Sequence, residues 1–265
     1  PYVLGKAQSA FGRDQMLEDT TLGWRFVNPR MLADYGTDSM PRTGENVAEE
    51  WNVSREEQDR FALASQEKAA AAQKNGRLAA EITSVTIPQH KGDAIVFDRD
   101  EHPRLSTMEG LARLKPVVTP DGTVTAGNAS GLNDGAAAML VATEGAAARN
   151  GLEPRARIVG IASAGVAPRV MGIGPVEAAR RLFARTGLDV DDFDVLELNE
   201  AFASQAIATL RELGVDPFDP RVNPNGGAIA LGHPLGMTGA RLALTATEEL
   251  VRKGGRRALV FLCVG

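Results

Sequence analysis

The sequence predicts an α/β fold made of layers of strands and helices, joined to a loop-rich region that precedes it. From Pro154 onward, short apolar runs alternate with longer segments of helical periodicity. These runs contain few polar residues, which is typical of strands buried on both faces. Before that point turn-forming residues are frequent. We therefore expect a layered body preceded by a loop-rich domain.

The first half of the chain contains one strong helical signal. Residues 1–42 carry turn signals and scattered aromatic side chains, and they predict an irregular surface region. A helical pattern begins at Thr43. Ser54 followed by Glu57 is a capping-box pattern, so we expect a long alanine-rich helix from there to Asn75–Gly76.

The other elements follow from apolar runs and helical periodicity. The expected strands are residues 82–87 and 94–97, which form a small sheet, and 136–142, 156–162, 195–198 and 258–263. The expected helices are a short alanine-rich helix closed by Asn150–Gly151 and residues 175–185, 201–213 and 238–253.

Composition excludes several classes of protein. The 265 residues are 43% hydrophobic and 24% charged, with a formal charge of −5, as in an ordinary globular protein. No apolar stretch approaches the roughly 18 residues that span a bilayer, and no signal segment opens the chain, so we expect a cytoplasmic protein with no membrane partner. The mild acidity argues against a nucleic-acid partner. The basic residues near Arg252 fit the end of a helix, where cations complement the dipole.

The single cysteine, Cys263, excludes an intrachain disulfide and a cysteine-rich zinc site. A lone cysteine in a buried strand usually serves as a small hydrophobic residue. Here Gly265 follows two positions later, so a thiol and a backbone N–H can face one site at a strand end. The chain starts at Pro1 rather than at Met and stops inside an apolar run, from which we expect a piece of a longer polypeptide.

Two polar motifs follow predicted strands or precede predicted helices. Asn199-Glu200-Ala201-Phe202 lies at the carboxyl end of a strand, where α/β sheets bind ligands, although Asn199 could also simply cap the next helix. The segment 223–236 holds four glycines around His233, which lies between Gly232 and Pro234. It matches neither phosphate-binding glycine pattern. A rigid imidazole in such a loop indicates a functional histidine.

The other two histidines carry less information. His90 stands beside Lys91 in a predicted turn. His102 ends the charged run 98–102, which resembles a set of metal ligands but lacks the glycine and glutamate of a calcium loop. We expect both histidines in solvated loops and no metal site.

These motifs together resemble the thiolase family. Its Asn-Glu-Ala-Phe, Gly-His-Pro and Cys-x-Gly elements occur here in the family's order. The segment 125–137 is similar to the part of thiolases that contacts pantetheine, and residues 38–41 and 45–48 are similar to their loop domain. Residues 23–29 most resemble the branch that acts on β-ketoadipyl-CoA. The resemblance extends over essentially the whole chain and implies the layered α-β-α-β-α thiolase fold, present in part, with the loop-rich domain as an inserted domain.

The resemblance implies a role for each matching residue. His233 would activate a nucleophilic cysteine and, with a water held by Asn199, would form one oxyanion hole. Cys263 would be the acid and base, and the Gly265 N–H would contribute to a second oxyanion hole. The CoA and acyl chain would be contacted by matching residues of three segments, namely Met40, Ser130, Ala201 and Phe202.

The family's nucleophilic cysteine has no counterpart in these residues, so the resemblance implies a missing N-terminal catalytic segment as a partner. Residues 1–131 would form the loop domain, 132–153 the end of the N-terminal catalytic domain, and 154–265 an incomplete C-terminal catalytic domain. Acyl-CoA substrates, with CoA or acetyl-CoA as substrate and no permanently bound cofactor, and a homodimer or homotetramer are implied as well.

The implied activity is cleavage of a 3-oxoacyl-CoA by CoA, or the reverse condensation. Arg25 and Arg169 could pair with a distal carboxylate of the substrate. One alternative is a non-catalytic CoA-binding remnant, because the nucleophile is missing. A second is a related condensing enzyme such as a ketosynthase, but such an enzyme would use two histidines and no Cys-x-Gly.

Overall fold

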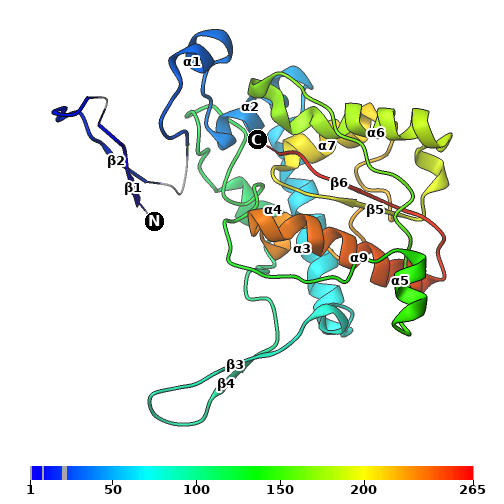
Figure 1. The fold of residues 1–265 in the computed structure, drawn as a ribbon. Helices are drawn as coiled ribbons and strands as arrows, with labels where there is room; N and C mark the ends of the chain where they lie inside the picture. Colours follow the sequence, from blue (N-terminus) through cyan, green and yellow to red (C-terminus); the bar gives the residue numbers. More distant parts are fainter. Residues whose placement is uncertain (1, 8, 20–22, 265) are drawn as a thin grey trace.

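The computed structural model describes residues 2–7, 9–19 and 23–264. At the centre of its main body is a parallel pair of strands, β5 (Val195–Leu198) and β6 (Ala258–Phe261). Helix α9 (Thr238–Lys253) covers one face of the pair, and α6 (Gly174–Thr186) and α7 (Ala203–Glu212) lie on the other face (Figure 1). This layering confirms the predicted α/β class.

Strand β5 is apolar enough to be buried on both faces, as the sequence predicts. All four of its residues are buried, and Leu196 and Leu198 belong to the main hydrophobic core. Leu198 stands opposite Phe261 of β6 in the parallel register. Because the two strands run in the same direction, the residues that follow each of them emerge at the same edge of the sheet.

Two long helices begin and end as their sequences predict. In α3 (Arg55–Lys74) the Ser54 hydroxyl accepts a hydrogen bond from the Glu57 N–H, and the Glu57 carboxylate accepts one from the Ser54 N–H. Helix α9 matches the predicted 238–253 and ends at Gly254, which has a left-handed φ of 66°. In its last turn Arg252 lies 2.6 Å from the buried Glu249 carboxylate, so the basic run does belong to a helix end.

The remaining elements are shorter. They are β1 (Tyr2–Leu4), β2 (Leu17–Asp19), α1 (Pro29–Tyr35), α2 (Met40–Glu50), β3 (Val85–Ile87), β4 (Ile95–Phe97), α4 (Met108–Ala112), α5 (Glu144–Arg149), α8 (Ala228–Leu231) and the 3-10 helices η1 (Leu78–Glu81), η2 (Pro168–Ile173), η3 (Val190–Asp192) and η4 (Leu235–Met237).

Two antiparallel hairpins extend from the body, β1–β2 and β3–β4 (Figure 1). The second hairpin confirms the predicted small sheet. The prediction of an irregular region over residues 1–42 was wrong in part, because β1, β2 and α1 form there and α2 begins at Met40 rather than at Thr43. Asn28 caps α1 by accepting from the Arg30 N–H at 2.9 Å, a local signal that the analysis of periodicity overlooked.

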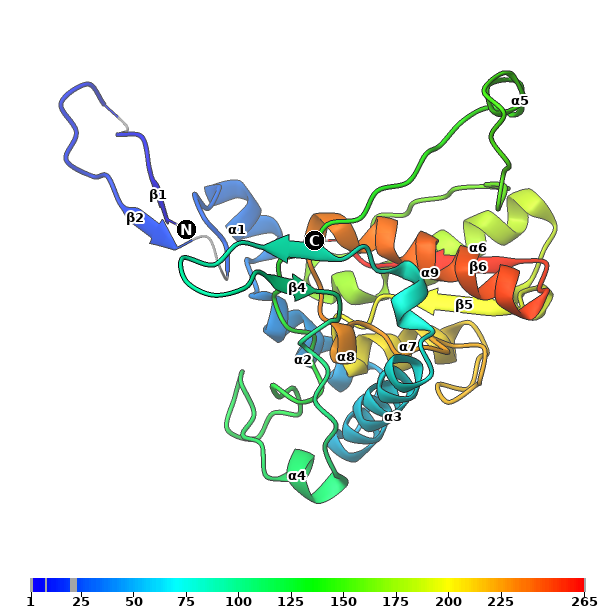
Figure 2. The same cartoon turned by 90° about the horizontal axis from the view of Figure 1, so that it is seen from below.

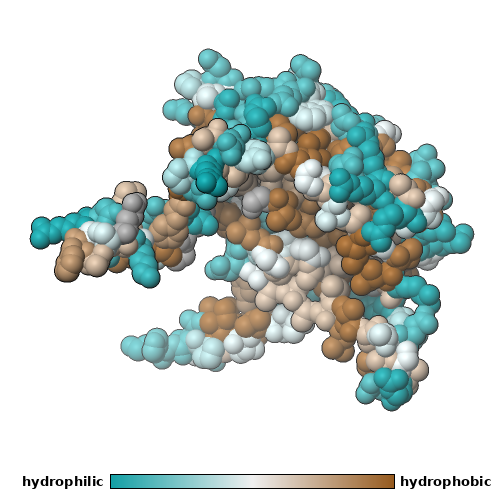
Figure 3. All heavy atoms as spheres, turned by 45° about the horizontal axis from the view of Figure 1, so that its top comes forward, coloured by the Kyte–Doolittle hydropathy of each residue, from teal (hydrophilic) through white to brown (hydrophobic). Residues whose placement is uncertain are grey.

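Two predicted strands do not form. Residues 136–142 and 156–162 run as extended chain on either side of α5 (Figure 2), and no strand of the described residues pairs with them. Their apolar side chains are exposed, with Leu140 at 89% and Val159 at 70%. Figure 3 likewise shows several patches of hydrophobic side chains exposed at the surface of the molecule. Without neighbouring strands the apolar pattern produces neither a ladder nor burial.

Within the described residues, no helix is both long enough and apolar enough to cross a membrane.

Candidate active site

The sheet edge brings together the two strand-end residues that the sequence singled out. Asn199 follows β5, and its N–H donates to the carbonyl of Phe261, the last residue of β6, at 3.1 Å. Cys263 lies two residues beyond Phe261. Both side chains are buried. Gly265, the other residue expected here, lies outside the described residues.

His233 reaches the same edge from a loop fixed by backbone geometry. The preceding Gly232 has φ +93°, where a side chain is strained, and a Cβ there would lie 2.3 Å from Asn133 Oδ1. The His233 N–H donates to the Gly131 carbonyl at 3.1 Å. The histidine loop, residues 228–234, is thereby held against the segment 125–133.

The His233 ring is held at both nitrogens. Its Nδ1 lies 2.7 Å from the hydroxyl of Thr238, the buried first residue of α9. Its Nε2 lies 3.3 Å from Nδ2 of Asn199. The side chains of His233 and Asn199 are therefore in contact. Thr238 was missed by the sequence reasoning, although its spacing of five residues from the histidine, across a short turn, was visible.

Asn199 does not cap a helix. The cap residue of α7 is Phe202, three residues later, so the alternative reading of Asn199 is wrong. The Asn199 side chain is completely buried, and its Oδ1 has no hydrogen-bond partner among the described residues. An unpartnered buried acceptor beside an imidazole is a place where a water or a substrate group would bind.

The charges around His233 favour its neutral form. Burial lowers the pKa of His233, and the positive charge of Arg241 on α9 lowers it further. Glu197 lies 3.7 Å from Arg241, and the carboxyl group of Asp100 also interacts with the arginine charge. Burial raises the pKa of Glu197 to about 8, so this carboxyl group offsets little of the arginine charge at neutral pH. A neutral imidazole can accept a proton from a thiol.

The protonation state of Cys263 differs from that of a nucleophilic cysteine, which reacts as a thiolate. Burial raises its pKa to about 11, so the group is a thiol rather than a thiolate at neutral pH. A buried thiol of this kind donates a proton readily only when a strong base, such as a carbanion, forms beside it. The site thus pairs a neutral base with a protonated acid.

The residues expected to contact CoA come from three neighbouring segments. The Ser130 N–H donates to the Ala201 carbonyl at 3.0 Å, and Ala129 bridges to Phe202. Phe202 is buried, and its ring packs so closely on α2 that a Cβ at Gly44 would lie 2.8 Å from it. Met40, half-buried, is the first residue of α2. The structure therefore places Ser130, Ala201 and Phe202 together, with Met40 on the adjoining helix.

Glu200 is a buried carboxylate that sequence reasoning did not single out beyond its motif. It accepts hydrogen bonds from the Ser65 hydroxyl at 2.7 Å, from the Asn223 amide at 2.7 Å and from the Ile229 N–H at 3.2 Å. Burial raises its pKa, and these bonds counter part of that shift. Glu200 thus joins the Asn199 strand end to α3 and to the glycine-rich loop.

The two other histidines differ from each other. His90 is exposed in the turn between β3 and β4, as predicted. His102 is half-buried, and its Nδ1 lies 2.8 Å from the Ala230 carbonyl, so the prediction of a solvated loop was wrong for this residue. The charged run folds back onto the body instead. No group of three or more His, Cys, Asp or Glu side chains placed to hold a metal ion occurs among the described residues.

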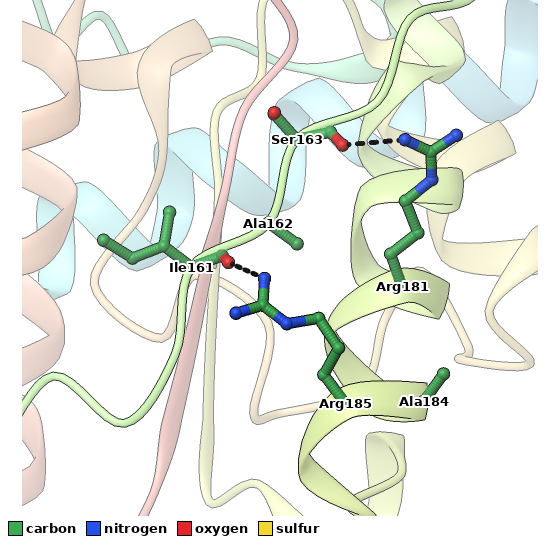
Figure 4. Close-up of a pocket in the computed structure, with 6 residues that line it drawn as sticks. All are labelled: Ile161, Ala162, Ser163, Arg181, Ala184 and Arg185. Carbon is green, nitrogen blue, oxygen red and sulfur yellow. Dashed lines mark hydrogen bonds between the residues drawn. The ribbon is translucent and has the colours of Figure 1, made fainter.

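One hollow lies elsewhere, on the α6 side. It has a volume of about 520 Å³ and is lined by Ile161, Ala162, Ser163, Arg181, Ala184 and Arg185. Figure 4 shows both arginines reaching toward the extended segment, where Arg185 donates to the Ile161 carbonyl at 2.7 Å and Arg181 to the Ser163 carbonyl at 3.2 Å. The hollow borders one of the segments that fail to form a strand, and it does not include the His233 site.

The architecture and the site together define an α/β protein in which a histidine contacts a buried asparagine with a free Oδ1, at the sheet edge where a buried thiol also lies. The chain matches the family models for the thiolase N-terminal domain over residues 9–145 and the thiolase C-terminal domain over residues 152–265. The chain therefore belongs to the thiolase family.

Curated relatives and solved structures agree with this assignment. The chain is 63% identical to "Beta-ketoadipyl-CoA thiolase" of Pseudomonas aeruginosa and 58% identical to "3-oxoadipyl-CoA/3-oxo-5,6-dehydrosuberyl-CoA thiolase" of Escherichia coli. It is similar to the crystal structure of human mitochondrial 3-ketoacyl-CoA thiolase, with a TM-score of 0.86 and 38% identity. A Bacillus anthracis acetyl-CoA acetyltransferase gives a TM-score of 0.86 and 40% identity. In each case all of this chain is covered, and it spans 66% of the other protein's length.

Proposed function

We propose that these residues form the histidine-bearing part of a thiolase that cleaves a 3-oxoacyl-CoA with CoA, or runs the reverse condensation. The observation that carries the proposal is the contact of His233 with Asn199 at the edge of the sheet where β5 and β6 end. Cys263 follows β6 by two residues, burial raises the pKa of its thiol, and burial with the charge of Arg241 favours the neutral form of His233. The nucleophilic cysteine would come from the partner segment, since Cys263 is the single cysteine of these residues.

In the cleavage direction His233 would take the proton of the nucleophilic thiol. Without such a base only about 3% of a free thiol is ionised at pH 7. The thiolate would add to the 3-oxo carbonyl carbon, and the bond between the α and β carbons would then break. The acyl group stays on the enzyme as a thioester, and the leaving fragment is the enolate of acetyl-CoA.

Cys263 would protonate that enolate and release acetyl-CoA. CoA would then attack the acyl-enzyme thioester and leave as a shortened acyl-CoA, which completes a ping-pong cycle. The oxyanion formed in each half-reaction would be stabilised by His233 with a water on Asn199, and by the Gly265 N–H. Each such donor contributes roughly 3 to 4 kcal/mol to transition-state stability.

CoA and the acyl chain would lie along Ser130, Ala201, Phe202 and Met40; the Ser130–Ala201 hydrogen bond, the Ala129–Phe202 bridge and the packing of Phe202 against α2 support this proposal. We propose 3-oxoadipyl-CoA as the acyl substrate, because the relatives that share about 60% identity carry that name. Arg169, one of two arginines suggested for the distal carboxylate, is paired with Glu50 in the structure, and any carboxylate it binds would have to compete with that glutamate.

Thiolysis assays with the full-length polypeptide test the activity and the substrate together. We expect turnover of 3-oxoadipyl-CoA, with a higher kcat/KM than for acetoacetyl-CoA. Turnover with a preference for acetoacetyl-CoA would overturn the dicarboxylic substrate alone. Absence of turnover on both substrates would overturn the thiolase activity.

The single cysteine favours one alternative, a CoA-binding remnant without catalysis. The reading frame upstream distinguishes the two, because a thiolase requires a cysteine-bearing domain there. If that domain is absent and the chain binds CoA without turnover, the chain is a CoA-binding remnant and not part of an active thiolase.

The other expectations stay predictions, the location from the composition of the chain and the rest from the resemblance. They are the homodimer or homotetramer, the cytoplasmic location, the lack of a permanently bound cofactor, and the domain limits at 131/132 and 153/154.

A further inference from the structure

The short helix α8 leads directly into Gly232 and His233, and it cannot satisfy its own carbonyl groups. A four-residue helix leaves most of its last carbonyls without an internal partner. Two of them are satisfied by side chains from distant parts of the sequence. Gln66 of α3 donates to the Ile229 carbonyl at 3.3 Å, and His102 approaches the Ala230 carbonyl at 2.8 Å.

The contact with Ala230 defines the state of the His102 ring. A carbonyl only accepts, so Nδ1 must carry the proton and donate it. The other ring nitrogen, Nε2, then faces the segment 125–133. A Cβ built at Gly131 would lie 2.4 Å from Nε2, so the glycine lets the ring reach the backbone.

The His102 ring therefore touches both sides of the backbone junction that holds His233. On one side is Ala230, three residues before His233. On the other side is Gly131, whose carbonyl accepts the His233 N–H at 3.1 Å and which adjoins Ser130. His102 itself is braced by α3, because the Arg104 N–H donates to the Gln66 side chain at 2.8 Å and the Gln73 amide donates to the Asp100 carbonyl at 3.0 Å.

We propose that His102 is a positioning residue for the thiolase reaction, which clamps the histidine loop to the segment that carries Ser130 and thereby fixes the His233 imidazole. This inference rests on the proposed function. His102 contacts neither of the ring nitrogens of His233, so its effect would pass through the backbone of residues 228–233.

The test compares three variants of the full-length polypeptide in thiolysis of acetoacetyl-CoA. His102→Leu removes the N–H donor. His102→Asn has the same branched arrangement of side-chain heavy atoms as leucine and retains an N–H near the position of Nδ1. His90→Leu changes an exposed histidine and serves as the control. We expect His102→Leu to lower kcat about 10- to 100-fold with little change in the KM for CoA, since a displaced catalytic group loses rate rather than substrate affinity. His102→Asn should recover most of the lost kcat, and His90→Leu should match the wild type.

A second measurement does not depend on turnover. Hydrogen exchange of the amides in residues 228–233 should speed up in His102→Leu and return toward the wild-type rate in His102→Asn, with the melting temperature as a check on global unfolding. A wild-type kcat and unchanged exchange in His102→Leu would overturn the clamp. Equal losses in both His102 variants, with KM rising and the melting temperature falling together, would also overturn it in favour of a general structural role. If the wild type itself has no thiolase activity, the proposed function fails, and the exchange measurement still decides whether His102 holds the loop.

Discussion

Strand β5 and the segment 156–162 contain the same kinds of residues, yet only β5 is a strand. Leu196 and Leu198 are completely buried, whereas Ile158 and Ile161 are 65% and 71% exposed. Strand β5 has β6 beside it and helices over both faces, and the segment 156–162 has no paired strand among the described residues. Apolar patterning thus shows which residues can form a strand, while burial depends on neighbours that the pattern does not supply.

This contrast also separates the site from its surroundings. Asn199, His233 and Thr238 lie in the packed region, where the ring of His233 contacts both of the others. The exposed segments carry none of the proposed catalytic groups. Substitutions in the packed region should therefore change activity or stability, whereas substitutions in the exposed segments should change neither by much. The predictions below test that difference and begin with the largest expected effect.

The largest effect is expected for His233→Ala in the full-length polypeptide. General-base and oxyanion roles together predict a loss of about 100- to 10,000-fold in kcat, with a much smaller change in KM, because the imidazole acts on charge that develops in the transition state. His90→Ala, on the exposed β3–β4 turn, is the matched control and should retain full activity. Steady-state thiolysis measures both. An unchanged kcat in His233→Ala would remove His233 from the mechanism.

The 265 residues alone should show no thiolysis. The two thiol roles require different positions and protonation states, and the chain has one cysteine, whose pKa is raised to about 11. Purified chain assayed with acetoacetyl-CoA and CoA checks this, with the N-terminal segment of the full-length polypeptide added as the second arm. Turnover by the chain alone would contradict the need for a second thiol.

The comparison of the two apolar regions is tested by a pair of truncations in the 265-residue chain. Leu198→Ala should lower the free energy of unfolding by about 2 to 5 kcal/mol, as for other fully buried leucines. Ile161→Ala should change it by less than about 0.5 kcal/mol, because the side chain is mostly exposed. Urea denaturation gives both values. The same pair of substitutions can be measured in the full-length polypeptide. If Ile161→Ala lowers the free energy of unfolding strongly there, Ile161 is buried by neighbours in the full-length polypeptide.

Cys263→Ser separates the two half-reactions. Serine is a much weaker acid than the thiol, so proton exchange at the acetyl-CoA methyl group should fall by about 100-fold or more, while acyl-enzyme formation should fall less. Exchange of deuterium into acetyl-CoA measures the first step, and single-turnover acylation measures the second. Equal losses in both would argue against an acid–base role for Cys263.

Much of the layered body could be predicted because its signals are local. The Ser54–Glu57 capping box marks the start of α3, and Gly254 marks the end of α9. Asn199 and His233 were found for the same reason, since each lies in a short motif. The failures have a different cause. The partner of His102 is 128 residues away, and no pattern near residue 102 reveals a carbonyl that needs a donor.

The effect of Arg241 on His233 is another long-range interaction that no local sequence pattern reveals, and it gives the smallest of the predicted effects. Arg241 lies one turn beyond Thr238 on α9, and among the charged groups near His233 it is the one whose charge shifts the imidazole. Burial and this charge lower the pKa of His233 below its ordinary value of about 6.5. The acidic limb of kcat/KM should therefore lie below pH 6.5, because the free imidazole keeps its basic form there.

The same pKa shift affects stability. The unfolded chain binds a proton at His233 more readily than the folded chain does. The contribution of His233 to the free energy of unfolding is therefore complete above pH 6.5 and is lost as the pH falls through the folded pKa.

Arg241→Leu should move that acidic limb to higher pH, and Arg241→Lys should leave it nearly in place because the positive charge is retained. The partner Glu197 is buried, and its pKa is already raised to about 8. It can therefore remain protonated after the arginine is removed, which limits the structural damage that an unpaired buried carboxylate would otherwise cause. The pH profiles of kcat/KM for the two variants measure the shift. A limb that stays in place in both variants would assign the low pKa of His233 to burial alone, and a limb that moves only in Arg241→Leu would show that the arginine charge helps to keep the imidazole neutral.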